Sequence, residues 1–173
     1  MTNLPAILQA GIITPGNELK ANQVSWASDD ISHKLDRRDS LDLGNYVHLS
    51  FCKYHPMLFA AKKEKRIATP VVLELDISLL GSYPFLFTDC NAVSNISQKG
   101  CDKSFLEKNI NFGIFRRSYF DLDYVGRGKY QAEIMIKSCI NVRFINKIYA
   151  VSTIYDPSYQ QNIFDFSSSY QRI

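Results

Sequence analysis

The alternation of apolar and polar positions along the chain predicts several short strands. Aromatic and β-branched residues cluster in "YVHLSF", "PFLF" and "KYQAEIMIKS", as is typical of strands. In "TPVVLELDISLL", Glu74 and Asp76 share one face and apolar residues the other, which predicts a buried strand. The predicted strands are 46–51, 69–80, 85–87, 129–138 and 145–155.

Helical patterns are fewer and lie between these strands. "NLPAILQAG" has Asn3 as an N-cap and Gly11 as a stop, and "HPMLFAAKKEK" begins with Pro56 in the first turn. The segment 12–45 is polar and irregular, which predicts a long loop with a helical turn, and 105–124 is either helix or loop. Because no regular βαβ rhythm or glycine fingerprint is present, the pattern predicts a mixed α+β fold.

A carboxylate inside the apolar run "GRGKYQAEIMI" needs an explanation. Residues two apart on a strand project to the same side, so Gln131 and Glu133 would direct an amide and a carboxylate into one cleft. The alternative is that Glu133 is an edge-strand carboxylate paired with a basic neighbour, either Lys129 or Arg127.

Length and composition predict one domain over residues 1–173, with 155–173 as a loosely packed tail. The chain has 173 residues, of which 46% are hydrophobic. Its four cysteines have no C-x-x-C spacing, so we expect no metal site and free thiols in a reducing compartment. No leader peptide or apolar run long enough for a membrane span is evident, which predicts a cytoplasmic protein without a membrane partner.

The formal net charge of +3 is concentrated in clusters of basic residues. Such clusters suit a polyanion, either a nucleic acid or a dinucleotide pyrophosphate, although solvated faces are the simpler interpretation of any one cluster. The clusters are Arg37 with Arg38, Lys62 to Arg66, Arg116 with Arg117, and Arg127 with Lys129.

Five separated segments, in order, resemble one known family. They are "NLPAILQAGI", "NYVHLSFCKYHPML", "PVVLELDI", "FLFTDCNA" and "KYQAEIMI". The chain resembles the DarT family of nucleic-acid ADP-ribosyltransferases, which implies the ADP-ribosyltransferase fold, a split pair of small mixed sheets with NAD+ in the cleft between them. One departure is "CKYHPM", where Lys53 and Tyr54 stand in place of the family's usual Pro-Arg before a Ser/Asn-Pro-Met step.

The resemblance implies roles for residues on the matching motifs. In that family the glutamate of the Q-A-E motif is catalytic, which implies this role for Glu133. A carboxylate there would stabilise the cationic ribose that forms as nicotinamide leaves, a reaction for which no metal is expected. Gln131 would face the acceptor base. Either Arg37 or Arg38 would hold the NAD+ phosphates or orient the acceptor, the alternative being surface ion pairs within "DRRD".

Other candidates are weaker. His48 and Met57 are placed at the NAD+ cleft by the resemblance, whereas ordinary packing would explain either. The full set of weaker candidates is Tyr46, His48 and Met57 for NAD+ or substrate binding, Thr88, Asp89 and Asn91 for the cleft rim, and Arg116, Arg117, Arg127 and Lys129 for a nucleic-acid track.

Together these features predict an NAD+-dependent mono-ADP-ribosyltransferase that modifies a nucleobase, with single-stranded DNA as the expected acceptor. The resemblance implies a toxin of a toxin–antitoxin or phage-defence system, with a macrodomain protein as the antitoxin. Three alternatives stay open: an RNA acceptor or a guanine or adenine base in place of thymine, a protein acceptor, and a catalytically inactive nucleic-acid-binding relative.

Overall fold

The computed structural model describes residues 3–22, 42–67 and 70–150. They form a four-stranded antiparallel sheet in the order β2-β6-β4-β5 and two two-stranded sheets, β3-β8 and β1-β7. The strands are β1 Ile12–Ile13, β2 Val47–Ser50, β3 Val71–Leu75, β4 Phe85–Thr88, β5 Lys99–Gly100, β6 Glu133–Ile136, β7 Ile140–Asn141 and β8 Ile145–Ala150. This mixed architecture confirms the predicted α+β class.

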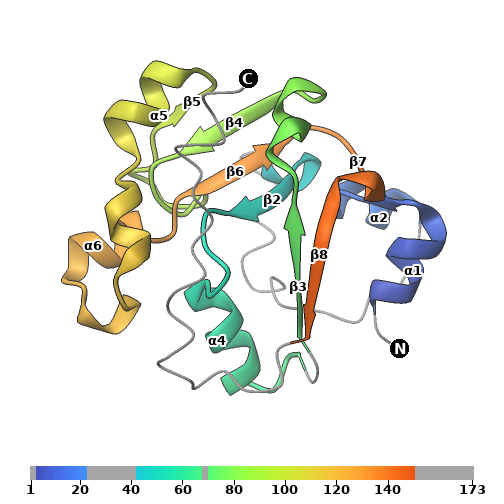
Figure 1. Cartoon of the computed structure of the whole chain (residues 1–173), viewed down its shortest axis with the longest axis horizontal. Helices are drawn as coiled ribbons and strands as arrows, with labels where there is room; N and C mark the ends of the chain where they lie inside the picture. Colours follow the sequence, from blue (N-terminus) through green and yellow to red (C-terminus); the bar gives the residue numbers. More distant parts are fainter. Residues whose placement is uncertain (1–2, 23–41, 68–69, 151–173) are drawn as a thin grey trace.

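Short helices surround these sheets. In Figure 1, α5 and α6 lie beside one end of the four-stranded sheet, β3-β8 stands beside its other end, and α1 and α2 lie beyond β8. The helices are α1 Asn3–Ala10, α2 Gly16–Ala21, α4 Pro56–Lys63, α5 Lys103–Asn109 and α6 Tyr124–Lys129, with 3₁₀ turns η2 Leu43–Asn45, η3 Ile77–Gly81, η4 Phe112–Arg116, η5 Tyr119–Asp121 and η6 Val142–Phe144. No described helix is long and apolar enough to span a bilayer.

Strand β6 is the central element, because β2 and β4 pair with it on its two sides. Its alternation divides the sheet into two faces. Ile134 and Ile136 belong to the large core, whereas Met135 packs in a smaller cluster on the face that also carries Glu133. Since β6 is not at an edge, the interpretation of Glu133 as an edge-strand carboxylate is wrong.

The strand predicted over 129–138 is shorter than expected. Asp123 caps α6 by accepting the Gly126 N–H, and this helix continues to Lys129. A turn follows, in which the backbone N–H of Gln131 donates to the Gly128 carbonyl. The ladder therefore starts only at Glu133, and Gln131 lies in the turn before β6.

The sheet β3-β8 differs from the prediction in its exposure. Val71 is 39% exposed and no residue of β3 is fully buried, because this sheet has only two strands. Asp76 follows β3 and accepts the Ser78 N–H as the cap of η3. The prediction of a strand here is confirmed, but the prediction of a buried one is wrong.

The region predicted as a long loop contains regular structure where it is described. Gly11 has a positive φ of 72°, which ends α1 and turns the chain into β1. Strand β1 pairs with β7 through Ile12 opposite Asn141, and α2 follows. Strand β1 was missed because a two-residue strand has no periodicity to detect, whereas α2 corresponds to the helical turn expected in this segment.

Most aromatic rings in the described chain build the main core. Phe51 stacks on Phe115 at 5.6 Å between centroids, and Phe115 meets Tyr130 edge-on at 5.6 Å. Helix α5 adds Leu106 to the same cluster. This core supports the face of the four-stranded sheet opposite Glu133 and so fixes the position of β6.

Candidate active site

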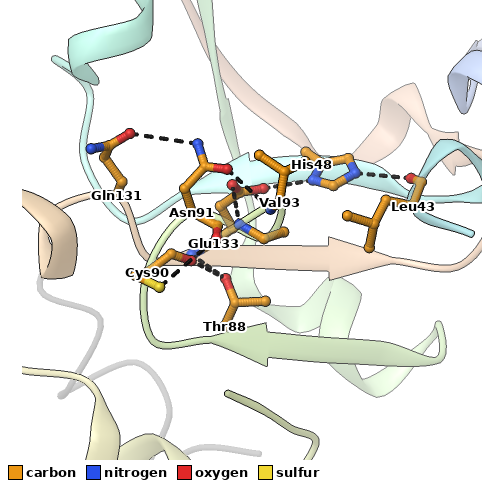
Figure 2. A network of polar contacts seen from close by, with 9 residues as sticks. Leu43, His48, Thr88, Cys90, Asn91, Val93, Gln131 and Glu133 are labelled. Carbon is orange, nitrogen blue, oxygen red and sulfur yellow. Dashed lines mark hydrogen bonds and ion pairs between the residues drawn. The ribbon is translucent and has the colours of Figure 1, made fainter. Parts of the chain in front are cut away.

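The carboxylate of Glu133 is held at both oxygens. Its Oε1 accepts the backbone N–H of Ala92 at 2.9 Å, and its Oε2 lies 2.6 Å from Nδ1 of His48 (Figure 2). The residue is only 6% exposed. A buried carboxylate with two directed partners keeps a fixed orientation, which a group that stabilises a developing charge requires.

His48 is fixed by its other ring nitrogen. Nε2 lies 3.0 Å from the backbone carbonyl of Leu43, and because a carbonyl only accepts, Nε2 carries a hydrogen. The short contact between Nδ1 and the Glu133 carboxylate then requires one further proton, on either partner. The pair is consequently able to hold one proton between a carboxylate and an imidazole.

The loop after β4 positions the Ala92 N–H. Thr88 is fully buried, and its hydroxyl accepts the Glu133 N–H at 3.1 Å while donating to the Cys90 carbonyl at 2.6 Å. Thr88 therefore links the start of β6 to this loop. The structure places it behind the site, and not at the rim where the sequence placed it.

Asp89 ties the same loop to α6. Its carboxylate accepts from the Gln98 N–H at 2.9 Å and from Nζ of Lys129 at 2.5 Å. Burial alone would raise the pKa of Asp89, but the bond to Lys129, with the Gln98 N–H, lowers it below its usual value. Asp89 is buried, so its role in the described structure is to anchor the loop.

Gln131 and Asn91 lie together above Glu133 (Figure 2). The Asn91 amide donates to Oε1 of Gln131 at 3.5 Å, and the Gln131 amide donates to the Arg127 carbonyl at 3.2 Å. Asn91 also accepts the Val93 N–H at 3.1 Å. Although Gln131 is not on the strand, the turn still brings its amide into the network that contains Glu133.

A hollow of about 740 Å³ separates the edge strand β2 from the sheet β3-β8. His48 and Ser50 line it from β2, and Lys147 and Tyr149 line it from β8. Glu133 is not among its lining residues, so the hollow reaches the site through His48. A volume of roughly 300 to 1,000 Å³ is usual for a small-molecule or cofactor site.

Charged groups gather on the β3-β8 side of this hollow. Nζ of Lys53 lies 3.3 Å from the centroid of the Tyr149 ring, and the Tyr149 hydroxyl donates to Glu74 at 2.5 Å. That bond raises the pKa of Tyr149, while burial lowers the pKa of Lys53. This group was missed in the sequence because it joins β3, β8 and the segment after β2, which lie far apart along the chain.

The other predicted site residues are distributed as follows. Tyr46 packs on the small cluster beneath Glu133, and Met57 lies in the first turn of α4. Arg37 and Arg38 lie outside the described residues, so their predicted role stays a prediction. The predicted nucleic-acid track is described: Arg116 and Arg117 are exposed, Arg127 donates to the Phe120 carbonyl at 2.9 Å, and Lys129 pairs with Asp89.

The described structure therefore combines a hollow between the four-stranded sheet and the sheet β3-β8 with a buried carboxylate on the first residue of a central strand. The family described as ssDNA thymidine ADP-ribosyltransferase, DarT, matches residues 1–169. The chain therefore belongs to the DarT family.

Solved structures of the same fold agree with this assignment. DarT of Thermus sp. 2.9 in complex with ADP-ribosylated ssDNA has a TM-score of 0.72 at 20% identity, over 90% of this chain and 78% of that chain. The same protein in complex with NAD+ gives 0.66 at 21% identity, over 87% and 78%. DarTG of Thermosipho africanus in complex with ADP-ribose gives 0.69 at 22% identity, over 86% of this chain and 41% of that chain. No curated protein matches significantly.

Proposed function

We propose that this protein transfers ADP-ribose from NAD+ to a thymidine base in single-stranded DNA, with Glu133 as the catalytic residue. Membership of the DarT family supports the reaction. The role of Glu133 is supported by the fixed orientation of its carboxylate, which accepts the Ala92 N–H and contacts the His48 ring.

The described residues suit the chemistry of transfer. NAD+ supplies the ADP-ribosyl group and releases nicotinamide. The Glu133 carboxylate stabilises positive charge on the ribose as that bond breaks. Thymine must lose its ring N–H when its nitrogen becomes glycosylated, and the proposed acceptor of that proton is the Glu133 carboxylate, with the proton that it shares with His48 held on the imidazole.

The hollow between β2 and β3-β8 is the proposed site of NAD+. Its volume of about 740 Å³ suits a dinucleotide, and Lys53 and Lys147 line it as cations that can approach a pyrophosphate. The family usually has an arginine at the next position, where this chain has Tyr54. We propose that the ammonium group of Lys53 replaces part of the contact that this arginine makes. Arg37 or Arg38 is the further proposed phosphate ligand.

The biological setting follows from the family and from the DarTG relative. We propose that the chain is the toxin of a toxin–antitoxin pair whose antitoxin is a macrodomain protein that removes the modification. A role in phage defence and a cytoplasmic location are part of the same proposal.

A panel of acceptors tests this function. The protein would be incubated with NAD+ and four acceptors: a thymidine-containing DNA strand, the same strand without thymidine, its RNA counterpart, and a protein extract. Mass spectrometry should find an added ADP-ribose on the first strand only. Modification confined to RNA or to protein would contradict the proposed acceptor, and modification of none would contradict the activity.

A further inference from the structure

Two hydroxyl groups flank Glu133 from the strands on either side of β6, and only one of them has a role so far. Ser50 on β2 and Thr88 on β4 are both paired directly with Glu133 in the antiparallel ladders. Directly paired residues project from the same face of a sheet, with their Cβ atoms about 4.5 to 5.5 Å apart. The Ser50 and Thr88 side chains therefore lie immediately beside Glu133, one on each side.

The two hydroxyl groups make the same local hydrogen bond. Oγ of Ser50 donates to the backbone carbonyl of Cys52 at 2.7 Å, and Oγ1 of Thr88 donates to that of Cys90 at 2.6 Å. A hydroxyl group has one hydrogen, so each oxygen can only accept in any further hydrogen bond. The turn that follows each strand therefore presents the hydroxyl oxygen as an acceptor.

The surroundings of the two hydroxyl groups differ. Thr88 is fully buried, and its oxygen accepts the Glu133 N–H. Ser50 is exposed, lines the hollow between β2 and β3-β8, and accepts no hydrogen bond from the described residues. Of these three side chains, Ser50 is consequently the one that a ligand in the hollow can contact directly, and its lone pairs are available to that ligand.

We propose that Oγ of Ser50 accepts a hydrogen bond from a hydroxyl group of the nicotinamide ribose of NAD+ and so positions C1′ of that ribose against the Glu133 carboxylate. This inference rests on the proposed function and adds a residue that positions the substrate. The reacting carbon must lie next to Glu133, and the hydroxyl groups on C2′ and C3′ are the ribose donors nearest to it. Ser50 lies one strand spacing from Glu133 and is within reach of such a hydroxyl group.

A neutral acceptor suits this position better than a charged group. The ribose becomes cationic as nicotinamide leaves, so a second positive charge beside it would oppose the reaction, and a second carboxylate would repel Glu133. A hydroxyl group with its hydrogen directed away turns its negative end toward the ribose. Because the Cys52 carbonyl already holds that hydrogen, Ser50 needs no reorientation when NAD+ arrives.

Substitutions at Ser50 separate the hydroxyl group from the strand. Ser50→Ala removes the acceptor, and Ser50→Thr keeps a hydroxyl group on a residue that strands favour. If Ser50→Ala did not fold, Ser50→Cys, whose thiol is a weak acceptor, would replace it in each measurement. Ser118→Ala is the matched control, because Ser118 accepts the Phe120 N–H at 3.3 Å in η5 and does not line the hollow.

The first readout is kcat/KM for NAD+ in transfer to a saturating thymidine-containing strand. Ser50→Ala should lower it about threefold to tenfold, the effect of one neutral hydrogen bond, whereas Ser50→Thr and Ser118→Ala should stay near wild type. Circular dichroism would establish that the variants are folded. An unchanged kcat/KM in folded Ser50→Ala, or an equal loss in folded Ser50→Thr or Ser118→Ala, would overturn the proposal.

Analogues of NAD+ test which group Ser50 binds. One analogue lacks the 2′ hydroxyl of the nicotinamide ribose and the other lacks the 3′ hydroxyl, and their dissociation constants would be measured by calorimetry without an acceptor strand. Wild type and Ser50→Ala should differ with NAD+ but bind one of the analogues equally, because neither protein can then form the bond. A structural role would weaken the binding of NAD+ and of both analogues by the same factor, and that result would overturn the proposal.

The two measurements also separate this inference from the proposed function. Wild-type transfer to the thymidine strand together with normal kinetics and binding by folded Ser50→Ala would overturn only the role of Ser50. If the wild-type protein transferred no ADP-ribose to the strand, the proposed function itself would have failed, and this inference with it.

Discussion

At the scale of single residues, the site depends on how Glu133 is held. His48 joins it at 2.6 Å and is itself anchored by the Leu43 carbonyl. We expect His48→Ala to lower the free energy of unfolding by about 1.5 to 3 kcal/mol, because a buried carboxylate loses a charge-assisted hydrogen bond. Denaturant unfolding would measure this loss. In a double-mutant cycle with Glu133→Gln the two effects should be clearly non-additive, and simple additivity would contradict the coupling.

His55 predicts a specific dependence of stability on pH. Burial lowers its pKa in the folded protein, so the unfolded chain binds a proton first as the pH falls below the ordinary value of about 6.5. The contribution of His55 is therefore complete above about pH 6.5 and is lost as the pH falls toward its lowered pKa. Thermal melts of wild type and His55→Asn between pH 7.5 and 5, roughly the span over which histidine titrates, should show the wild type losing more stability. Parallel curves would contradict the lowered pKa.

At the residue scale, the sequence predicted the catalytic candidate but not its partners. Glu133 stood out because a carboxylate in an apolar run is rare. Its contacts with His48 and Ala92 depend on tertiary structure, since they come from β2 and from the loop after β4. The Ala92 contact uses a backbone N–H, which leaves no trace in the amino-acid type.

At the scale of elements, Thr88 couples β4 to the first residue of β6. Thr88→Val keeps the shape but leaves the Glu133 N–H without its acceptor, so stability should fall by about 1 to 3 kcal/mol. The rate of transfer should fall by more than the loss of stability explains. Thr88→Val also removes the hydrogen bond to the Cys90 carbonyl, which holds the loop that positions the Ala92 N–H. Denaturant unfolding and transfer rates would measure both. Thr88→Ser keeps the hydroxyl and is the control, so equal damage by both substitutions would contradict this account.

The pattern of apolar and polar residues predicted the positions of most strands, but not all of their boundaries or their burial. The strands at β2, β4, β6 and β8 were predicted, because aromatic and β-branched runs are distinctive. The start of β6 was placed too early, since the capped helix α6 and its turn form their own local hydrogen bonds up to Ala132. Strand β3 was expected to be buried, but sequence alone does not tell how many strands will flank a strand.

At the scale of the whole molecule, the surface beside α6 combines aromatic and basic groups. Phe120 is 61% exposed, Tyr124 93% and Val125 67%, and Arg127 lies 5.6 Å from the Tyr119 ring. Exposed rings beside arginines suit unpaired bases and their phosphates. The Gln131 amide donates to the Arg127 carbonyl and accepts from Asn91, so it joins this surface to the loop beside Glu133. The nucleic-acid track itself stays a prediction.

A salt series tests that track. Each phosphate contact removed should lower the log–log salt dependence of strand binding by about 0.7. We therefore expect the triple variant Arg116→Ala, Arg117→Ala and Arg127→Ala to bind a strand more weakly and with a smaller slope. Lys129 is left unchanged because it pairs with Asp89. Fluorescence anisotropy would measure binding, Lys103→Ala on α5 is the control, and an unaltered slope would contradict the track.

The arrangement of the sheets could not be predicted from periodicity. The α+β class followed from the pattern, but the hollow between β2 and β3-β8 arises from pairings between segments far apart in sequence. The two-sheet cleft was expected only through the family resemblance. Lys53 and Tyr149 illustrate what the sequence pattern does not predict. Neither lies in a recognisable motif, and their side chains come together only in the folded chain.

The most direct measurement of the central claim compares wild type with Glu133→Gln on one thymidine-containing single strand in the presence of NAD+. The substitution keeps the shape and removes the charge, so the yield of ADP-ribosylated strand, followed by mass spectrometry, should fall on the order of 100-fold or more. Circular dichroism and melting would establish that the variant is folded. A strong loss in a folded variant is the result that the account predicts, and transfer by Glu133→Gln at a rate near that of wild type would contradict it.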